Sequence, residues 1–544
     1  MIPKKTIYRV LLLTLLALAV GALGGATYTR IMTQRQLSEL FSSGRLPIHT
    51  NNSKLESTLR IIKDHYIDTI GIDTLVEAMM PELLNRLDPH TTYIPVQDMS
   101  KMNEALDGEF DGIGVVFNMA TDTVIVLNVI TGGGSAKAGV MARDRIIEIN
   151  DTIVAGQSLS QDYVVSRLRG PRGTSVKLGL ERGGIDGLVE VEVVRDKVPI
   201  NSISSSFIIK DKIGYIRLDQ FSRKTYAEFL AAISKLQSEG MESLIFDLRG
   251  NSGGFMDQAI LLAGEFLPRD QLIVYTEDRS GRQDRQYSSR NGALQDLPLV
   301  VLIDEGSASS SEILAGALQD NDKGTIIGRR SFGKGLVQQQ IPFSDGSAIR
   351  LTVARYYTPT GRSIQKPYEM GAGEDYSLDL YRRIEHDELF SIDSISFNDS
   401  LRRVTPAGRV VYGGGGIMPD IFVPLSKEKL PEFYIEVMGR NILYKYTIEY
   451  SDLHRDELAS LSSLEELDRY LSLDKSLVSD FVKYASREGV EAKGNELKES
   501  EERLRHQLRA YIGRNTNLSD NGYYANIYPL DSVMLRAIEE LKGE

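Results

Sequence analysis

Three glycine- and serine-rich turns carry the residues of this chain that are best suited to covalent chemistry. They are DLRGNSGG at 247–254, DEGSASSSE at 304–312 and SFGKG at 331–335, and each follows an apolar run typical of a buried strand. The second turn places Ser309 just before the predicted helix ILAGALQ. Backbone N–H groups and the dipole at the start of a helix stabilise an oxyanion that forms on an attacked carbonyl group. Ser309 is therefore a candidate nucleophile.

The same serine has a second interpretation. Ser309 and Glu312 fit the S-x-x-E pattern of a capping box, in which the serine hydroxyl caps the first turn of a helix. Capping and nucleophilic attack compete for one hydroxyl group, and the sequence leaves both interpretations open.

A serine nucleophile needs a base that accepts its proton. The chain contains six His, but none lies between His90 and His386, which predicts that no Ser-His-Asp triad assembles within the part of the chain that carries the turns. The remaining bases are carboxylates and a Lys whose pKa is lowered by burial. Lys334 lies between two glycines in the third turn and could point inward; an exposed turn lysine is the alternative.

Lys334 also completes a G-x-x-x-x-G-K pattern that begins at Gly328. The next residue is Gly335 instead of Ser or Thr, so the Mg²⁺ ligand of a phosphate-binding loop is missing. A nucleotide site is not expected in this turn.

The composition restricts the classes of function. The chain has 544 residues with 42% hydrophobic and 25% charged residues, which is typical of a globular protein of several domains. The absence of Cys excludes disulfides, thiol nucleophiles and Cys-bound zinc. A net charge of -12 argues against nucleic acid as the main partner, because phosphate binding favours a basic surface. The six His are scattered singly, and no metal or organic cofactor is expected.

An α/β core must position the three turns. From about residue 200 to 360, strand-like runs alternate with helical patterns at 224–238, 256–266 and 310–319, which predicts a mostly parallel sheet. Sites in such sheets form at the carboxyl ends of the strands. We divide the chain into five regions: a signal peptide or membrane anchor at 1–30, a linker and helical region at 31–105, a β-rich domain at 106–196, the core at 197–426 and a helical region at 427–544.

The amino terminus predicts the compartment. Lys4, Lys5 and Arg9 precede an uncharged, apolar stretch from Val10 to Thr29, as in a secretory signal or a single membrane anchor. This segment is expected to contact the membrane, and the rest of the chain is expected to be periplasmic or otherwise extracytoplasmic. Whether the segment is cleaved is left open.

Taken together, the three turns resemble the core of the carboxyl-terminal processing peptidases, or tail-specific proteases. The resemblance runs from about residue 55 to 425 and includes LDPHTTYI, TPTGRSIQKPY and YGGGGIMPDIFVP. It implies a crotonase/ClpP-like α/β protease core, Ser309 as nucleophile, Lys334 as general base and Gln338 as the residue that orients this Lys. It also implies an oxyanion hole made by the backbone N–H groups of Gly254 and Ser310.

The inserted region 106–196 resembles a PDZ domain. A peptide would add to it as a strand, and a short loop would hold the terminal carboxylate, made by Gly112, Ile113, Gly114 and Val115. A β-rich domain with ordinary glycine turns is the alternative. In the family this domain gates the active site, and Arg169 is a candidate for coupling its position to Gln338. Whether the domain activates or inhibits is left open.

The sequence thus predicts an exported serine endopeptidase with a Ser-Lys dyad. It would recognise exposed apolar carboxyl termini through the PDZ domain and cleave unstructured or misfolded polypeptides, so its partners are unfolded or tail-exposed protein substrates. The alternative is a membrane-tethered PDZ scaffold that binds carboxyl-terminal tails without cleaving them. Apolar-faced helices near both ends of the chain could form a homo-oligomer or cover the core.

Overall fold

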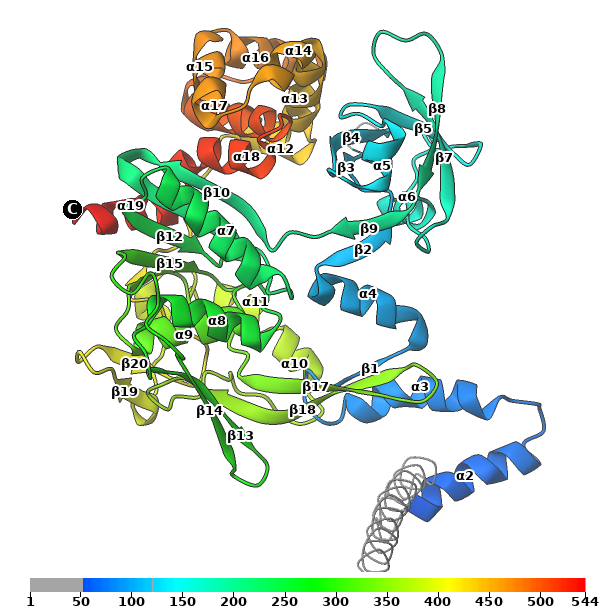
Figure 1. Ribbon diagram of the computed structural model, residues 1–544, viewed down its shortest axis with the longest axis vertical. Helices are drawn as coiled ribbons and strands as arrows, with labels where there is room; N and C mark the ends of the chain where they lie inside the picture. The colour runs from blue at the N-terminus through cyan, green and yellow to red at the C-terminus, as the bar shows by residue number, and fades with distance from the viewer. Residues whose placement is uncertain (1–51, 120–121, 544) are drawn as a thin grey trace, which may run out of the picture. The chain divides into compact units, whose positions relative to one another are not determined.

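A computed structural model describes residues 52–119 and 122–543 (Figure 1). The chain divides after Met80 into two units. The described part of the first unit holds α2 (Asn52–His65) and most of α3 (Ile72–Leu84), which agrees with the helical pattern expected there. No helix among the described residues is both long and apolar enough to cross a membrane. The predicted signal or anchor at 1–30 lies outside the described residues.

The second unit contains a six-stranded central sheet. Its strand order is β10-β11-β12-β15-β16-β21, and all neighbours are parallel except β10, which runs antiparallel to β11. The strands are β10 (Ile203–Ile209), β11 (Ile213–Leu218), β12 (Ser243–Asp247), β15 (Leu299–Ile303), β16 (Thr325–Gly328) and β21 (Ile421–Phe422). Every residue of β12 and β15 is buried, as expected for parallel strands covered on both faces. The predicted α/β class is confirmed.

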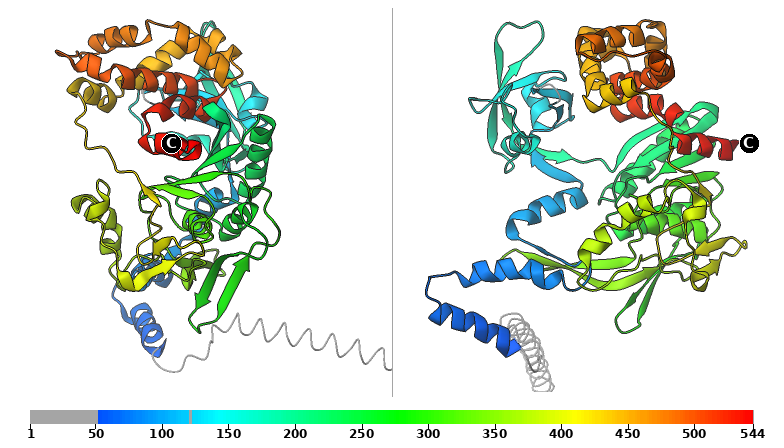
Figure 2. Two further views of the ribbon diagram at one scale, coloured as in Figure 1. Left: turned by 90° about the vertical axis from the view of Figure 1, so that its left-hand side faces the viewer. Right: turned by 180° about the vertical axis from the view of Figure 1, so that it is seen from behind.

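Helices cover both faces of this sheet. On one face, alternate strand residues such as Leu244 and Phe246 pack against α7 (Thr225–Ser238), α8 (Met256–Phe266) and α9 (Ser310–Asp320). On the other face, Ile245 and its counterparts pack against α19 (Ser532–Lys542). Figure 2 shows the same core from the side and from behind. The end of the carboxyl-terminal region therefore covers the core, one of the two roles that the sequence left open.

The contact made by α19 gives a first testable prediction. Met534 is 2% exposed and packs in the cluster that joins α19 to the sheet. Met534→Ala is expected to lower the free energy of unfolding by about 2 to 5 kcal/mol, because it leaves a cavity in this layer. Urea unfolding monitored by circular dichroism measures this loss. Leu535→Ala is the matched control, since Leu535 is 41% exposed on the same helix and its replacement should change the stability by under about 1 kcal/mol.

A second sheet lies beside the Lys334 turn. Its order is β1-β18-β13-β14, with β17 also paired to β18. The strands are β1 (Thr92–Ile94), β13 (Leu272–Asp278), β14 (Gln283–Tyr287), β17 (Leu336–Pro342) and β18 (Ala348–Tyr357). Pairing of β1 with residues 348–350 brings the LDPHTTYI segment, distant in sequence, to the α/β core.

The inserted domain is β-rich, as expected. Its main sheet has the order β3-β4-β5-β7-β8 with β6 added to β5, and β2 pairs separately with β9. The elements are β2 (Glu109–Gly112), β3 (Val115–Asn118), β4 (Val124–Val129), α5 (Gly134–Ala138), β5 (Arg145–Ile149), β6 (Thr152–Ile153), α6 (Gln161–Leu168), β7 (Ser175–Glu181), β8 (Leu188–Val194) and β9 (Asp196–Pro199). Val124, Ile146 and Leu178 belong to its own hydrophobic core.

The remaining elements connect or follow the core. They are α4 (Val96–Asp107), α10 (Gly373–Ser377), α11 (Asp379–Glu385), β19 (Arg402–Val404) and β20 (Val410–Tyr412). The carboxyl-terminal helices with a separate hydrophobic core are α12 (Glu432–Gly439), α13 (Ile442–Leu453), α14 (Arg455–Ser460), α15 (Leu464–Leu473), α16 (Leu477–Arg487), α17 (Glu496–Arg514) and α18 (Ser519–Ile527). The predicted helical region at the end of the chain is confirmed as helical.

Candidate active site

The three turns singled out in the sequence meet at one edge of the central sheet. They follow β12, β15 and β16, whose carboxyl ends lie side by side because these strands are parallel. The Ala308 N–H donates to the Asn251 carbonyl oxygen at 2.9 Å, and the Phe332 N–H donates to the Ser307 carbonyl oxygen at 3.0 Å. The middle turn is therefore hydrogen-bonded to both of its neighbours, at the edge where open α/β sheets place their sites.

Ser309 occupies a strained position at the start of α9. It is the N-cap residue and has φ 55° and ψ −113°, a conformation that non-glycine residues seldom adopt. Its side chain is half-buried. The adjacent Ser310 hydroxyl donates to the Gly254 carbonyl oxygen at 2.9 Å, which joins this turn to the first one. A sharp strand-to-helix turn that presents a serine in this way is typical of serine nucleophiles.

The first turn approaches Ser309 so closely that it requires glycine. Gly253 has φ 102°, and a Cβ atom added to it would lie 2.7 Å from the Ser309 Cβ atom. Gly254 has φ 143°, and its added Cβ atom would lie 2.1 Å from the Phe221 carbonyl oxygen. Among the hydrogen bonds of the described residues, none uses the Gly254 N–H. Ser310 is the first residue of α9, where backbone N–H groups have no partner within the helix. Both predicted oxyanion donors thus lie next to Ser309.

Gly253→Ala is expected to lower kcat/KM by about a hundredfold or more, since the new methyl group must displace Ser309 from its position. Steady-state cleavage of an unfolded protein measures this loss. Gly264→Ala is the matched control, because no atom lies within 4 Å of a Cβ added there in α8. Equal activity of the two variants would contradict the close approach described here.

Glu312 joins the Ser309 turn to the Lys334 turn. One carboxylate oxygen accepts the Ser309 N–H at 2.8 Å and the Lys334 N–H at 2.9 Å. The other accepts the Gly333 N–H at 2.7 Å and the Ser331 hydroxyl at 2.6 Å. Burial raises the pKa of Glu312 to about 7, against the lowering effect of these hydrogen bonds. The sequence suggested only a helix cap for Glu312, because its contacts with the third turn depend on tertiary structure.

Lys334 is half-buried beside Ser309. Burial lowers its pKa, and the positive charge of Arg350 lowers it further, while Glu312 and Asp88 act in the opposite direction. The Tyr356 hydroxyl donates a hydrogen bond to the Lys334 carbonyl oxygen and lies 3.2 Å from the Ser309 carbonyl oxygen. Within residues 52–119 and 122–543, no hydrogen bond directly joins the Ser309 hydroxyl to the Lys334 amine. The fold brings the two residues together through their backbones.

Among the described residues, no hydrogen bond joins Gln338 to Lys334. Its amide nitrogen donates to the Leu336 carbonyl oxygen at 3.2 Å and to the Thr352 hydroxyl at 3.4 Å. The Thr352 hydroxyl donates in turn to Asp88 at 3.0 Å. Gln338 is therefore linked to the LDPHTTYI segment, and its predicted role in orienting Lys334 stays a prediction.

His90 is an additional neighbour of the lysine turn. The absence of His between His90 and His386 predicts that no Ser-His-Asp triad forms, but the pKa of His90 itself responds to the charge of Lys334. Burial, and then Lys334, lowers the pKa of His90 to about 4. Its Nε2 atom lies 3.0 Å from the Tyr376 hydroxyl. His90 is thus a neutral neighbour of the site, brought in by the pairing of β1 with β18.

Two further segments hold the lysine turn from outside. The Lys366 N–H donates to the Gly333 carbonyl oxygen at 2.9 Å, and the Gln365 side chain accepts the Gly335 N–H at 2.8 Å. The Ile417 N–H donates to the Ser331 hydroxyl at 2.6 Å. These contacts explain why TPTGRSIQKPY and YGGGGIMPDIFVP accompany the three turns in the sequence.

The inserted domain presents its predicted peptide loop at a free sheet edge. Gly112 ends β2 and Val115 begins β3, the edge strand of the five-strand order. Between them, the Ile113 and Gly114 carbonyl oxygens accept backbone N–H groups at 2.8 and 3.0 Å. An edge strand can pair with an added peptide strand.

Arg169, predicted to couple the PDZ position to Gln338, interacts with other residues. Its guanidinium pairs with Glu104 at 2.5 Å and lies over the Phe110 ring, 4.3 Å from the ring centre. In the part of the chain that the structure describes, Arg169 makes no contact with Gln338. Its coupling role stays a prediction.

Known proteins share both domains. Residues 212–377 match peptidase family S41, residues 112–193 match the PDZ domain, and residues 433–516 match a family of unknown function. The carboxy-terminal-processing protease of Bartonella bacilliformis is 38% identical over 309 residues, which are 56% of this chain and 70% of that protein. The carboxy-terminal processing protease CtpB of Bacillus subtilis is 32% identical over 58% of this chain and 65% of its own length.

One similar solved structure is the photosystem II D1 C-terminal processing protease, which is 29% identical in sequence. The match covers 91% of that protein and 58% of this chain, with a TM-score of 0.33. A PDZ domain of a carboxy-terminal protease from Vibrio cholerae, solved with a peptide, is 33% identical over 16% of this chain and 97% of that domain, with a TM-score of 0.15. The matches to family S41 and to the curated relatives show that this chain belongs to the carboxy-terminal processing proteases, a family of serine peptidases with a PDZ domain.

Proposed function

We propose that this chain is an exported endopeptidase that cleaves unfolded or misfolded polypeptides with a Ser309–Lys334 dyad. The observation that carries the proposal is the shared carboxylate of Glu312, which accepts the backbone N–H groups of both residues. It holds a strained serine at a helix start next to a lysine whose pKa burial lowers.

The reaction follows from these positions. Neutral Lys334 takes the proton of the Ser309 hydroxyl as its oxygen attacks the carbonyl carbon of the peptide bond. The Gly254 and Ser310 N–H groups stabilise the negative oxygen that forms. Protonated Lys334 then gives its proton to the leaving amine, and an acyl group remains on Ser309. Water, deprotonated by Lys334, attacks this ester. The bond to the Ser309 oxygen breaks, Lys334 returns the proton to this oxygen, and the new carboxyl terminus is released. We assign to Gln338 the positioning of Lys334, for which the Gln338 side chain would leave the Thr352 hydroxyl.

Substrate recognition is assigned to the PDZ domain. The loop from Gly112 to Val115 would bind a terminal carboxylate through its backbone N–H groups, while β3 pairs with an apolar tail. The names of the relatives, carboxy-terminal processing proteases, favour carboxyl-terminal substrates. In this proposal, binding of a tail breaks the ion pair between Arg169 and Glu104, and Arg169 then contacts the protease core.

Cleavage of an unfolded protein with an apolar carboxyl terminus tests the proposal, with a matched copy whose last residues are aspartates. We expect the apolar tail to be cleaved at least about tenfold faster, because its last side chain needs an apolar pocket. The chemistry fails if wild type cleaves no faster than Ser309→Ala from about pH 6 to about pH 9. Binding of the apolar tail without any cleavage would instead support the PDZ scaffold.

The proposal of export and membrane contact is based on the positive residues Lys4, Lys5 and Arg9, which precede the apolar stretch from Val10 to Thr29. We propose that this segment is a signal or an inner-membrane anchor and that the protease acts in the periplasm or another extracytoplasmic space. Alkaline phosphatase fused after Glu544 should be active in intact cells, since it folds only when exported. Removal of residues 1–30 should abolish this activity, and activity without them would contradict the assignment.

Oligomerisation is the remaining part of the proposal. The exposed apolar side chains of α2 and α3, such as Ile61 at 60% and Leu83 at 58%, fit a contact between copies of the chain. Light scattering during size-exclusion chromatography tests this contact, with Ile61→Lys and Leu83→Lys expected to yield monomers. A monomeric wild type would contradict it.

A further inference from the structure

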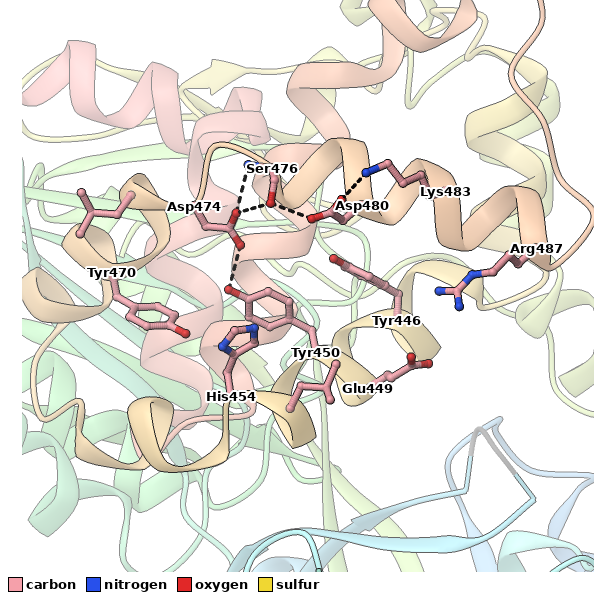
Figure 3. A pocket seen from close by; sticks show the side chains of 12 residues that line it. Tyr446, Glu449, Tyr450, His454, Tyr470, Asp474, Ser476, Asp480, Lys483 and Arg487 are labelled. Atoms are coloured by element: carbon pink, nitrogen blue, oxygen red, sulfur yellow. Dashed lines mark hydrogen bonds and ion pairs between the residues drawn. The ribbon is translucent and has the colours of Figure 1, made fainter.

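A cavity of about 820 Å³ lies in the carboxyl-terminal helical region, away from the residues of the proposed reaction. It is built by α13, α15, α16 and the short segments that connect them (Figure 3). Nothing in the proposed proteolysis uses these helices, and the family that residues 433–516 match has no known function. The proposed proteolysis therefore does not explain this cavity.

Aromatic side chains form one wall of the cavity. The rings of Tyr450 and His454 have centres 4.4 Å apart, and the centres of His454 and Tyr470 lie 6.5 Å apart. Tyr446 continues the wall, with its ring centre 6.1 Å from that of Tyr450. Tyr446 and Tyr450 are only 8% and 7% exposed, so packing holds them in place before any ligand binds.

Carboxylates lie directly behind these rings. Asp474 accepts the Tyr450 hydroxyl at 3.0 Å, and the Ser476 hydroxyl contacts Asp474 at 2.9 Å and Asp480 at 2.7 Å (Figure 3). No side-chain hydrogen bond or ion pair of the described residues involves Glu449, which also lines the cavity. Burial raises the pKa of Tyr446, and the negative charges of Asp480, Asp474 and Glu449 raise it further. The aromatic wall is therefore in a negative field.

The cations of the lining do not neutralise this wall. Lys483 pairs with Asp480 at 2.8 Å, and the Arg487 guanidinium lies 5.4 Å from the centre of the Tyr484 ring. Both belong to α16, on the side of the cavity away from Tyr470 and His454 in Figure 3. The corner formed by Tyr450, Tyr470 and Asp474 has no lysine or arginine of the lining next to it.

Two leucines at the cavity are exposed to an unusual degree. Leu453 is 75% exposed and Leu473 is 77% exposed, and both belong to the lining. Among the large apolar side chains of the described residues, only Ile67 and Met370 are more exposed. Apolar side chains gathered at a cavity mark a surface where a partner binds.

We propose that this cavity binds a lysine or arginine side chain of a polypeptide segment whose neighbouring residues are apolar. The cation would sit against the half-buried Tyr470 ring next to the Asp474 carboxylate, which Tyr450 holds through its hydroxyl, since aromatic rings and carboxylates together attract a cation that has lost part of its hydration. The neighbouring apolar residues would cover Leu453 and Leu473. The site lies outside the reaction of Ser309 and does not depend on it.

A short peptide tests this site on the full chain carrying Ser309→Ala, which cannot cleave the probe. The probe is a fluorescent Gly-Leu-Lys-Leu-Gly peptide with blocked ends, so that it offers no terminal carboxylate to the PDZ loop. Fluorescence anisotropy is expected to show saturable binding. Replacing its lysine by acetyl-lysine should raise Kd by about tenfold, because only the charge is removed. Equal binding of the two peptides would overturn the proposal.

Two variants locate the binding on the protein. Asp474→Asn keeps an acceptor for Tyr450 but removes the charge, and Tyr470→Leu removes one ring; each should raise Kd for the lysine peptide about five- to tenfold. Glu465→Gln is the matched control, since Glu465 is 85% exposed on the helix of Tyr470, lies outside the cavity and should leave Kd unchanged. If a Tyr470→Leu variant whose thermal transition shows that it is folded bound the peptide as wild type does, the aromatic wall would have no role in binding. Equal weakening by Asp474→Asn and Glu465→Gln, which each remove one negative charge, would show attraction to the general negative charge and contradict a specific site.

Discussion

Lys334→Ala is expected to lower kcat/KM by at least about 1000-fold, because it removes the group that takes the Ser309 proton in the proposed dyad. The variant should fold, since the contacts of this turn with Glu312 and Tyr356 use the Lys334 backbone. Cleavage of an unfolded protein by wild type and variant, together with thermal transitions, measures both effects. A Lys334→Ala protein that retains most of its activity would exclude the dyad while leaving Ser309 as nucleophile.

The pH profile gives this prediction a second readout. Burial and Arg350 lower the pKa of Lys334, so the neutral, basic form becomes populated at a lower pH than for an ordinary lysine. Activity should therefore rise with pH as Lys334 loses its proton. Arg350→Gln removes a positive neighbour, raises the pKa of Lys334 and should move this rise to higher pH. A shift to lower pH, or none, would mean that another group controls the profile.

Glu312→Gln is expected to lower both stability and activity. The carboxylate accepts four donors, whereas an amide can offer only one accepting oxygen and turns its NH₂ group toward two of them. Buried donors that lose their acceptor cost about 1 to 3 kcal/mol each, so the free energy of unfolding should fall by about 2 to 5 kcal/mol. Activity should fall about a hundredfold, because Ser309 and Lys334 lose their common support.

A buried glutamate elsewhere provides the control. Glu265 is 3% exposed and pairs with Tyr226 and Arg290 away from the three turns. Glu265→Gln should lower stability but leave kcat/KM of the folded fraction unchanged. If Glu312→Gln behaved in the same way, its role would be structural only.

Glu312 also predicts a dependence of stability on pH. Because its pKa is raised from 4.5 to about 7 in the folded state, the folded protein holds this proton more tightly than the unfolded chain. Its contribution to stability is therefore full below about pH 4.5 and falls by about 3 kcal/mol as the pH rises to about 7. Urea unfolding at several pH values should show this fall in wild type and not in Glu312→Gln. An unchanged slope in the variant would assign the effect to another group.

Local patterns in the sequence were sufficient to predict the elements around the site. The helices expected at 224–238, 256–266 and 310–319 are α7 (Thr225–Ser238), α8 (Met256–Phe266) and α9 (Ser310–Asp320). Their bounds follow from apolar periodicity and, for α8 and α9, from the glycine-containing turns before them, which are properties of neighbouring residues. The parallel order of the strands followed from the same alternation.

The sequence by itself also determined that the three turns meet, because parallel strands bring their carboxyl ends to one edge of the sheet. It left capping and nucleophilic attack open at Ser309, and the φ of 55° and the close approach of Gly253 to this residue are visible only in the tertiary structure. Nor could it place His90 beside Lys334 or connect Glu312 to Ser331, since these residues meet only when β1 pairs with β18 and α9 packs beside the third turn. Contacts between distant segments are set by the whole fold, and only the tertiary structure decided them.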